Sequence, residues 1–345
     1  MGKQPLSHFL GVFMKIVKPD FYDRFRCLAG ECPDSCCHEW EVDVDADAAA
    51  RYLALEGPLG DRLREVLKAS TDGYSMSIQN RRCPMWRRDG LCEIQAQLGH
   101  DALCETCREF PRLRHDYGDY VELGLELSCP EAARLLFAPY GFVEESLPGG
   151  EPECDPRLFS LLLDSRKQAL EFLETSPLPV GEKLAVLLLY AYDVQAALDG
   201  DALLPLDASL LESAQKYATG GDISGFYPFF ESLEILTPRW KKQLHRAPTA
   251  KKCREELGYL MKYLICRYWL QAVADGELTV WVKFMIIACL LINALGGDLI
   301  ATAQLFSKEI ENDPDNLEAI LDAVYCETPF TDGNLLGLLL NTQHL

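Results

Sequence analysis

The chain shows two different patterns of apolar and polar residues. Beyond residue 156, apolar residues recur every three or four positions, which is typical of helices with one buried face. Almost no stretch there alternates with a period of two, so we predict an all-helical C-terminal region. The expected helices are Arg157–Thr175, Gly181–Leu198, Ala208–Thr219, Ala250–Ala274, Val280–Leu295, Leu299–Glu311 and Leu317–Tyr325.

The first half has a shorter and less regular pattern. Apolar and acidic residues alternate in Trp40–Val44, which predicts a short strand. Asp45 or Asp47 is placed to cap a helix over Ala48–Leu55. We therefore predict a mainly α protein, in which an irregular cysteine-rich N-terminal region precedes the helical one.

A segment rich in glycine and proline separates the two patterns. Between Leu147 and Pro156 these residues disfavour a regular element. We predict a cysteine-rich domain over residues 1–146, a linker over 147–156 and a helical domain over 157–345.

The longest apolar run is Leu278–Leu295, which contains Lys283 and Asn293. A membrane-spanning helix needs about 20 predominantly apolar residues, so we predict a buried core helix and no membrane insertion. The first 16 residues lack the pattern of a signal peptide. The expected location is the cytoplasm.

Composition and charge exclude one class of partner. The chain is 48% hydrophobic and 25% charged, as folded proteins are, and its net charge is −20. Proteins that bind nucleic acids take much of their affinity from Lys and Arg, so we expect no nucleic-acid partner.

Ten of the fourteen cysteines lie in the first 154 residues. Clustered thiols in a reducing compartment indicate metal or redox chemistry more than disulfides. Thiolates bind structural zinc and also iron–sulfur clusters, so the sequence leaves both metals and a second site open. Small buried cysteines also pack as hydrophobic residues, and this is the preferred interpretation for Cys104, Cys154, Cys253, Cys266, Cys289 and Cys326 taken singly.

Several cysteine-containing motifs occur in a characteristic order. They are Tyr22–Trp40 with four cysteines, Arg82-Cys83-Pro84, Asp89–Gln95 with Cys92, Thr106–Arg112 with Cys107, and Ser128–Arg134 with Cys129. Together they resemble the flagellin lysine-N-methylase family, and Tyr263–Tyr268, Ala272–Gly276 and Val282–Phe284 resemble its C-terminal helices. The first part also resembles a wider group of CxxCxxCC-type proteins that chelate zinc or iron.

The resemblance implies a methyltransferase that uses S-adenosylmethionine to methylate lysine ε-amines of flagellin. It also implies a 4Fe-4S cluster, with zinc as the alternative metal. Cys104 stands where the family is expected to have another residue. The implied metal ligands are among Cys27, Cys32, Cys36, Cys37, Cys83, Cys92, Cys107 and Cys129.

The cofactor site is expected to be unconventional, because no strand leads into a Gly-x-Gly turn as in a dinucleotide-binding fold. Two arginines are candidates for binding the carboxylate of the cofactor. Arg82 belongs to a local basic island, although it also fits a solvated loop. Arg267 lies in an apolar helix, where a snorkelling arginine is the commoner case.

The methyl acceptor must be a neutral amine, which requires a base or a desolvating pocket. The sequence does not identify the base. The aromatic residues that are candidates for walls, each of which also fits an ordinary core or surface position, are Trp40, Trp86, Tyr117, Tyr120, Tyr263 and Tyr268. The alternative function is a non-catalytic zinc-binding module whose helical half docks a partner protein.

Overall fold

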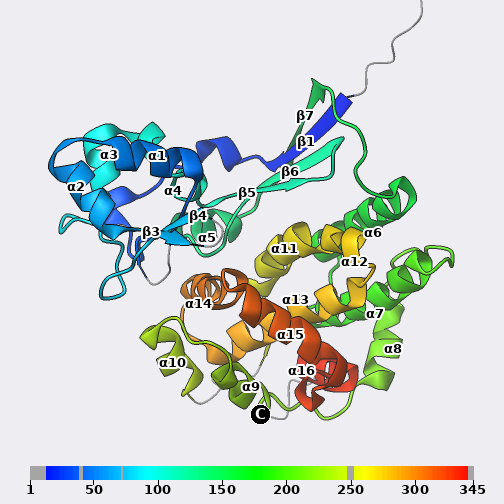
Figure 1. Ribbon diagram of the computed structural model, residues 1–345. Coiled ribbons are helices and arrows are strands. Elements are labelled where there is room, and N and C mark those ends of the chain that lie inside the picture. Colours follow the sequence, from blue (N-terminus) through cyan, green and yellow to red (C-terminus); the bar gives the residue numbers. More distant parts are fainter. Residues whose placement is uncertain (1–12, 39–41, 71–72, 247–251, 341–345) are drawn as a thin grey trace, which may run out of the picture.

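Four strands from the N-terminal half form a sheet, sheet A, which lies along one side of the helices (Figure 1). The computed structural model describes residues 13–38, 42–70, 73–246 and 252–340. The strand order is β5-β6-β1-β7, with β1 parallel to β6 and antiparallel to β7. The strands are β1 (Phe13–Pro19), β5 (Arg112–Asp116), β6 (Tyr120–Leu125) and β7 (Phe142–Pro148).

A small lobe inserted between β1 and β5 carries most of the clustered cysteines (Figure 1). Its core is separate from that of the helices and includes Val44, Tyr52, Leu63 and Met85. The elements are β2 (Val42–Val44), β3 (Leu67–Ser70), β4 (Gly73–Met76), α1 (Ala46–Ala54), α2 (Gly57–Val66), α3 (Glu93–Leu98) and α4 (Glu105–Glu109).

The helix cap predicted at the start of the lobe is confirmed. Asp45 is the N-cap of α1, where its Oδ1 accepts a hydrogen bond from the Ala48 N–H at 2.8 Å. Its Oδ2 accepts another from the Glu105 N–H at 2.8 Å, which fixes the start of α4. The predicted strand is present as β2, and Trp40 lies outside the described residues.

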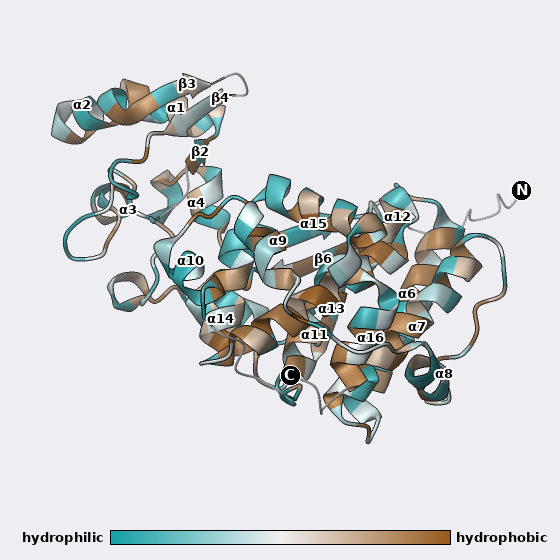
Figure 2. Ribbon diagram, turned by 90° about the horizontal axis from the view of Figure 1, so that it is seen from below, coloured by the Kyte–Doolittle hydropathy of each residue, from teal (hydrophilic) through white to brown (hydrophobic). Residues whose placement is uncertain are grey.

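The rest of the described chain is helical and forms the main body of the protein. Hydrophobic residues concentrate on the inner helices (Figure 2). The α-helices are α5 (Pro130–Leu136), α6 (Pro156–Thr175), α7 (Val180–Leu198), α8 (Leu210–Tyr217), α9 (Phe226–Ser232), α10 (Pro238–Leu244), α11 (Leu257–Tyr268), α12 (Ala272–Asp275), α13 (Leu278–Leu295), α14 (Leu299–Phe306), α15 (Pro314–Cys326) and α16 (Asp332–Leu340). The short 3₁₀ turns are η1 (Tyr22–Arg24), η2 (Ala29–Glu31), η3 (His100–Ala102), η4 (Trp269–Gln271) and η6 (Thr328–Phe330).

Helix α13 forms the centre of the helical body. Within the described residues it alone is long and apolar enough to cross a membrane, yet 83% of it is buried inside the protein. It packs against α7, α11, α14 and α15. Lys283 donates a hydrogen bond to the Val324 carbonyl at 2.9 Å, and its Nζ lies 3.2 Å from Asp332, which supplies the opposite charge. This burial agrees with the predicted core helix.

A π-helical turn, η5 (Ser307–Glu311), follows α14 directly. The Asn312 N–H donates to the Ser307 carbonyl at 3.2 Å, which is the i→i−5 bond of a π turn. All five residues of the turn are buried, including three charged ones, so each charge requires a partner inside the protein.

The mainly α fold and the helical C-terminal region agree with the prediction, but the description of the N-terminal region as irregular is wrong. That region contains two sheets. Strand β7 is exposed along its whole length and therefore has no apolar alternation, and its partner β1 lies more than 100 residues earlier. It ends at Pro148, inside the expected linker 147–156, and the division into domains there stays a prediction.

Candidate functional site

Six cysteines of the N-terminal region line one small cavity of about 50 Å³, which we call the thiol pocket. Its other walls include Tyr52, Met76, Met85 and Phe110. The Cys83 N–H donates to the Cys37 carbonyl at 2.9 Å, which brings two of the cysteine motifs together. The six are Cys36, Cys37, Cys83, Cys92, Cys104 and Cys107.

Hydrogen bonds between neighbouring thiols divide the pocket into groups that ionise differently. Cys36 bonds to Cys37, and Cys107 bonds to Cys104. These bonds lower the pKa of Cys37 and of Cys104 to about 7, and they raise the pKa of the partner thiol in each pair. Burial raises the pKa of Cys83 to about 12. A bound cation would favour the thiolate form of all of them.

The predicted ligands are thus only partly brought together. Five of the eight line the thiol pocket, while Cys27, Cys32 and Cys129 lie outside its lining. The pKa of Cys129 is raised to about 11 by burial, with smaller contributions from Cys32 and Cys27, so these three thiols form a second neighbourhood. Cys104, which the prediction left out, lies in the pocket, and the Cys104-x2-Cys107 spacing is the signal that would have indicated it.

The donor set of the thiol pocket suits a soft metal. A set of six thiols fits zinc or an iron–sulfur cluster, whereas magnesium and calcium prefer oxygen ligands. Among the residues the structure describes, no three Cys, His, Asp or Glu side chains are already arranged as a metal centre. Loading therefore requires the thiols to turn toward a common point, and the ligand set stays a prediction.

A second and larger cavity, of about 590 Å³, lies between sheet A and helices α6 and α11. We call it the charged cavity. Side chains alternate between the two faces of a strand, so every second residue of the four strands faces the same side. The strand residues on this wall include Lys15, Val17, Leu113, His115, Tyr120, Glu122, Gly124, Phe142 and Glu144.

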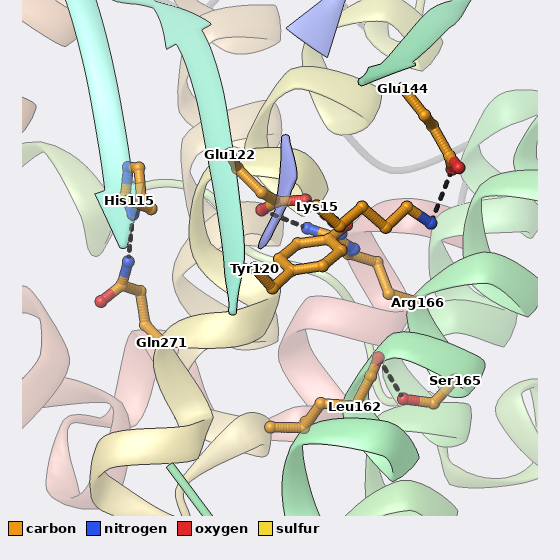
Figure 3. A network of polar contacts seen from close by, with 9 residues as sticks. All are labelled: Lys15, His115, Tyr120, Glu122, Glu144, Leu162, Ser165, Arg166 and Gln271. Carbon is orange, nitrogen blue, oxygen red and sulfur yellow. Dashed lines mark hydrogen bonds and ion pairs between the residues drawn. The ribbon is translucent and has the colours of Figure 1, made fainter. Parts of the chain in front are cut away.

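One ion pair at the charged cavity joins the sheet to helix α6, and another joins two neighbouring strands (Figure 3). Arg166 of α6 binds Glu122 through both guanidinium nitrogens, with Nη1 2.8 Å from Oε2, and both side chains are nearly buried. At the more exposed edge, Lys15 Nζ lies 2.9 Å from Glu144. Each of these charges within the cavity therefore has an opposite charge beside it.

Arg267 of α11 contributes a guanidinium with one nitrogen unpaired. Its Nε lies 2.9 Å from the Tyr268 hydroxyl and 3.2 Å from Glu311, a carboxylate with no exposed surface. Its Nη1 is buried and has no hydrogen-bond partner among the residues that the structure describes. Burial disfavours the charge on Arg267, but Tyr263, Tyr268 and Glu311 outweigh it and hold the pKa well above its ordinary value.

The two arginines expected at a cofactor lie in different places. Arg82 belongs to the small lobe, where its guanidinium lies 4.5 Å from the centre of the Trp86 ring. Arg267 lines the charged cavity. Their proposed role in binding the cofactor stays a prediction.

Two of the aromatic candidates, Tyr120 and Tyr263, line the charged cavity. His115, which sequence reasoning did not select, lies on the same wall. Its Nδ1 is 2.8 Å from the Gln271 amide nitrogen (Figure 3), and burial lowers its pKa. At neutral pH the wall therefore carries a neutral imidazole.

The π turn links the cysteine loop to the charged cavity. Lys308 Nζ lies 3.0 Å from Asp34, which stands between Cys32 and Cys36. Three positions further on, Glu311 accepts a hydrogen bond from the Tyr268 hydroxyl at 2.7 Å. The π turn thus contacts both the cysteine loop and the residues beside the charged cavity.

The chain is similar to three curated proteins. It is 32% identical over 132 residues to a lysine-N-methylase of Salmonella typhimurium, where the match covers 36% of this chain and 33% of that protein. It is 31% identical over 132 residues to the flagellar biosynthetic protein FliU of Salmonella muenchen, of which it covers 78%. The chain thus matches only about a third of the length of the lysine-N-methylases.

Two further comparisons gave no relatives. No family model matches the chain. No solved structure matches it.

Proposed function

Because the chain belongs to the family that includes the lysine-N-methylases and FliU, we propose that it is a cytoplasmic S-adenosylmethionine-dependent methyltransferase that acts on lysine ε-amines of flagellin. The observation that carries this proposal is the similarity that extends over most of FliU. The names of the relatives supply the reaction and point to a flagellar substrate. The two cavities supply places where the chemistry fits.

The reaction sets two demands on the protein. The lone pair of a neutral lysine amine forms a bond to the methyl carbon while the bond from that carbon to the sulfonium breaks, and the electron pair stays on sulfur. The amine must first lose a proton, since an ammonium has no lone pair. A pocket that excludes water favours the neutral amine.

The thiol pocket is the proposed place of an iron–sulfur cluster. Cys37 and Cys104 are the thiols that ionise most readily there, and Cys83 and Cys92 lie on the same lining. A bound cluster supplies a thiolate-held iron centre with Lewis-acid and one-electron chemistry. The chain's own contribution is to hold the thiols on turns that Asp45 and the Cys37–Cys83 backbone bond fix in place.

The proposal is tested on protein purified without oxygen. We expect absorbance between about 350 and 450 nm, iron and sulfide in the same sample, and labelled methyl transferred from S-adenosylmethionine to flagellin. Flagellin with its exposed lysines changed to arginine is the matched control substrate and should remain unlabelled. Colourless protein that contains zinc and transfers no methyl would instead establish the zinc-binding interaction module.

A further inference from the structure

We infer that the charged cavity binds S-adenosylmethionine and that Arg267 receives the carboxylate of its methionine end. This inference rests on the proposed function and assigns a place to the cofactor. The cavity is the larger of the two described above and falls within the usual size of a small-molecule site. The thiol pocket, at about 50 Å³, is too small for a nucleoside.

The unpaired Nη1 of Arg267 indicates that the ligand carries a carboxylate. A buried donor without a partner costs stability, and a carboxylate satisfies it with a charge-assisted hydrogen bond. Glu311 already occupies the Nε side of the guanidinium, which leaves the Nη edge for a ligand. The π turn and two tyrosine hydroxyls fix Glu311 and therefore hold Arg267 in one orientation.

The same geometry argues against the substrate lysine as the occupant of this end of the cavity. A lysine ammonium offers only donors, and Arg267 also offers only donors. A phosphate-rich nucleotide fits poorly as well, because the lining carries as many carboxylates as Lys and Arg side chains and so has no excess positive charge for several phosphates. A ligand that has one carboxylate, and whose other groups carry positive charge, matches both the donors of Arg267 and the carboxylates of the lining.

The remaining walls suit the sulfonium, the amine and the adenosine of the cofactor. Asp164 and Glu171 of α6 add carboxylates to the lining, and negative charge there favours the cationic sulfonium and amine. Leu113, Leu136 and Leu170 provide apolar surface for a flat base.

Direct binding to the full chain tests the inference. Binding of S-adenosylmethionine and of its decarboxylated analogue is measured by calorimetry on the same anaerobic preparation. We expect the wild type to bind the intact cofactor at least about tenfold more tightly, as the loss of a charge-assisted hydrogen bond predicts. Arg267→Met should lower the affinity for the intact cofactor by the same factor, so that this variant binds both compounds equally. Arg82→Met should still bind the intact cofactor more tightly than the analogue.

A second variant tests the location without disturbing an ion pair. A Cβ at Gly124 would meet only ordinary contacts, with Leu113 side-chain atoms at 3.8 and 3.9 Å, so Gly124→Leu fits the strand. Its longer side chain extends into the cavity and should reduce binding at least tenfold while the circular dichroism spectrum stays unchanged. Gly258→Leu is the control, since within the described part of the chain no atom lies within 4 Å of the added Cβ.

The results separate this inference from the proposed function. Equal binding of the two compounds by the wild type, or unchanged binding by Gly124→Leu, would overturn the inference even if flagellin is methylated. Wild-type protein that binds the cofactor with the expected preference and leaves flagellin unlabelled would support the site and contradict the substrate. Failure of the wild type to bind S-adenosylmethionine at all would overturn both.

Discussion

The thiol pocket and the charged cavity are built in opposite ways. The pocket gathers one kind of donor from short segments within a lobe that has its own core. The cavity gathers charges of both signs from four strands and two helices that share the main core. Ionised thiols cannot neutralise one another and need a bound cation, whereas opposite charges satisfy one another and leave only selected atoms free.

This difference predicts how each region responds to substitution. Loss of a thiol should remove a ligand and leave the helical body intact, because the two cores are separate. Loss of a charge in the cavity should destabilise the main fold, because its partner remains buried.

The largest expected effect is on metal content. Replacing Cys83 and Cys92 together by serine should lower the iron or zinc bound per chain at least about tenfold, since a hard hydroxyl is a poor substitute for a soft thiolate. Metal analysis of the purified protein checks this. Cys326→Ser changes an exposed thiol outside the pocket and should have no effect. Unchanged metal in the double variant would show that the pocket is not the metal site.

The next effect is on the stability of the main fold. Glu122→Gln leaves the nearly buried guanidinium of Arg166 without its counter-charge and should cost about 3–5 kcal/mol. Glu144→Gln removes the corresponding pair at the exposed edge, where the carboxylate is 60% exposed, and should cost less than about 1 kcal/mol. Urea unfolding of both variants gives the two values, and equal costs would contradict the contrast.

A smaller effect depends on pH. Burial raises the pKa of Glu309 from 4.5 to about 7, so the folded protein holds this proton more tightly than the unfolded chain does. The contribution to stability is full below pH 4.5 and is lost as the pH rises to 7, by about 2–3 kcal/mol. Glu309→Gln should flatten this part of the profile in urea unfolding between pH 4 and 8. Glu318→Gln, at an exposed position of α15, should leave it unchanged.

The smallest effect concerns the start of α1 in the small lobe. Asp45→Ala removes the cap and the bond to the Glu105 N–H, and should cost about 1 kcal/mol. Asp47→Ala, two positions later in the first turn, should lower the free energy of unfolding by only about 0.3 kcal/mol. Thermal unfolding measures both. Equal values would contradict the assignment of the cap to Asp45.

The long helices were predictable because their pattern is local, whereas α9, α10 and α16 were not among the expected helices. The expected Arg157–Thr175 and Gly181–Leu198 differ from α6 and α7 by a single residue at their starts. Sheet A was not predictable, because β1 pairs with β6 and β7 more than 100 residues away and β7 has no buried side.

The site was predictable to the same extent. The cysteine spacing indicated that several thiols would lie together, and the sequence also selected Arg267, whose role at a cofactor stays a prediction. The residues that line the sheet wall of the charged cavity could not be predicted from the sequence, because they become neighbours only when the strands pair. His115 shares that wall with Glu122 through the register of β5 and β6.

The π turn sets a limit on how the length of the chain can change. Removing one residue from Ser307–Glu311 would convert the turn to an ordinary helix and rotate the residues after it by about 100°. Lys308 and Glu311 lie only three residues apart in this turn, so one such deletion would disturb both the ion pair of Lys308 with Asp34 in the cysteine loop and that of Glu311 with Arg267. A substitution in the π turn can therefore affect the cysteine loop or the charged cavity alone, whereas a deletion there affects both.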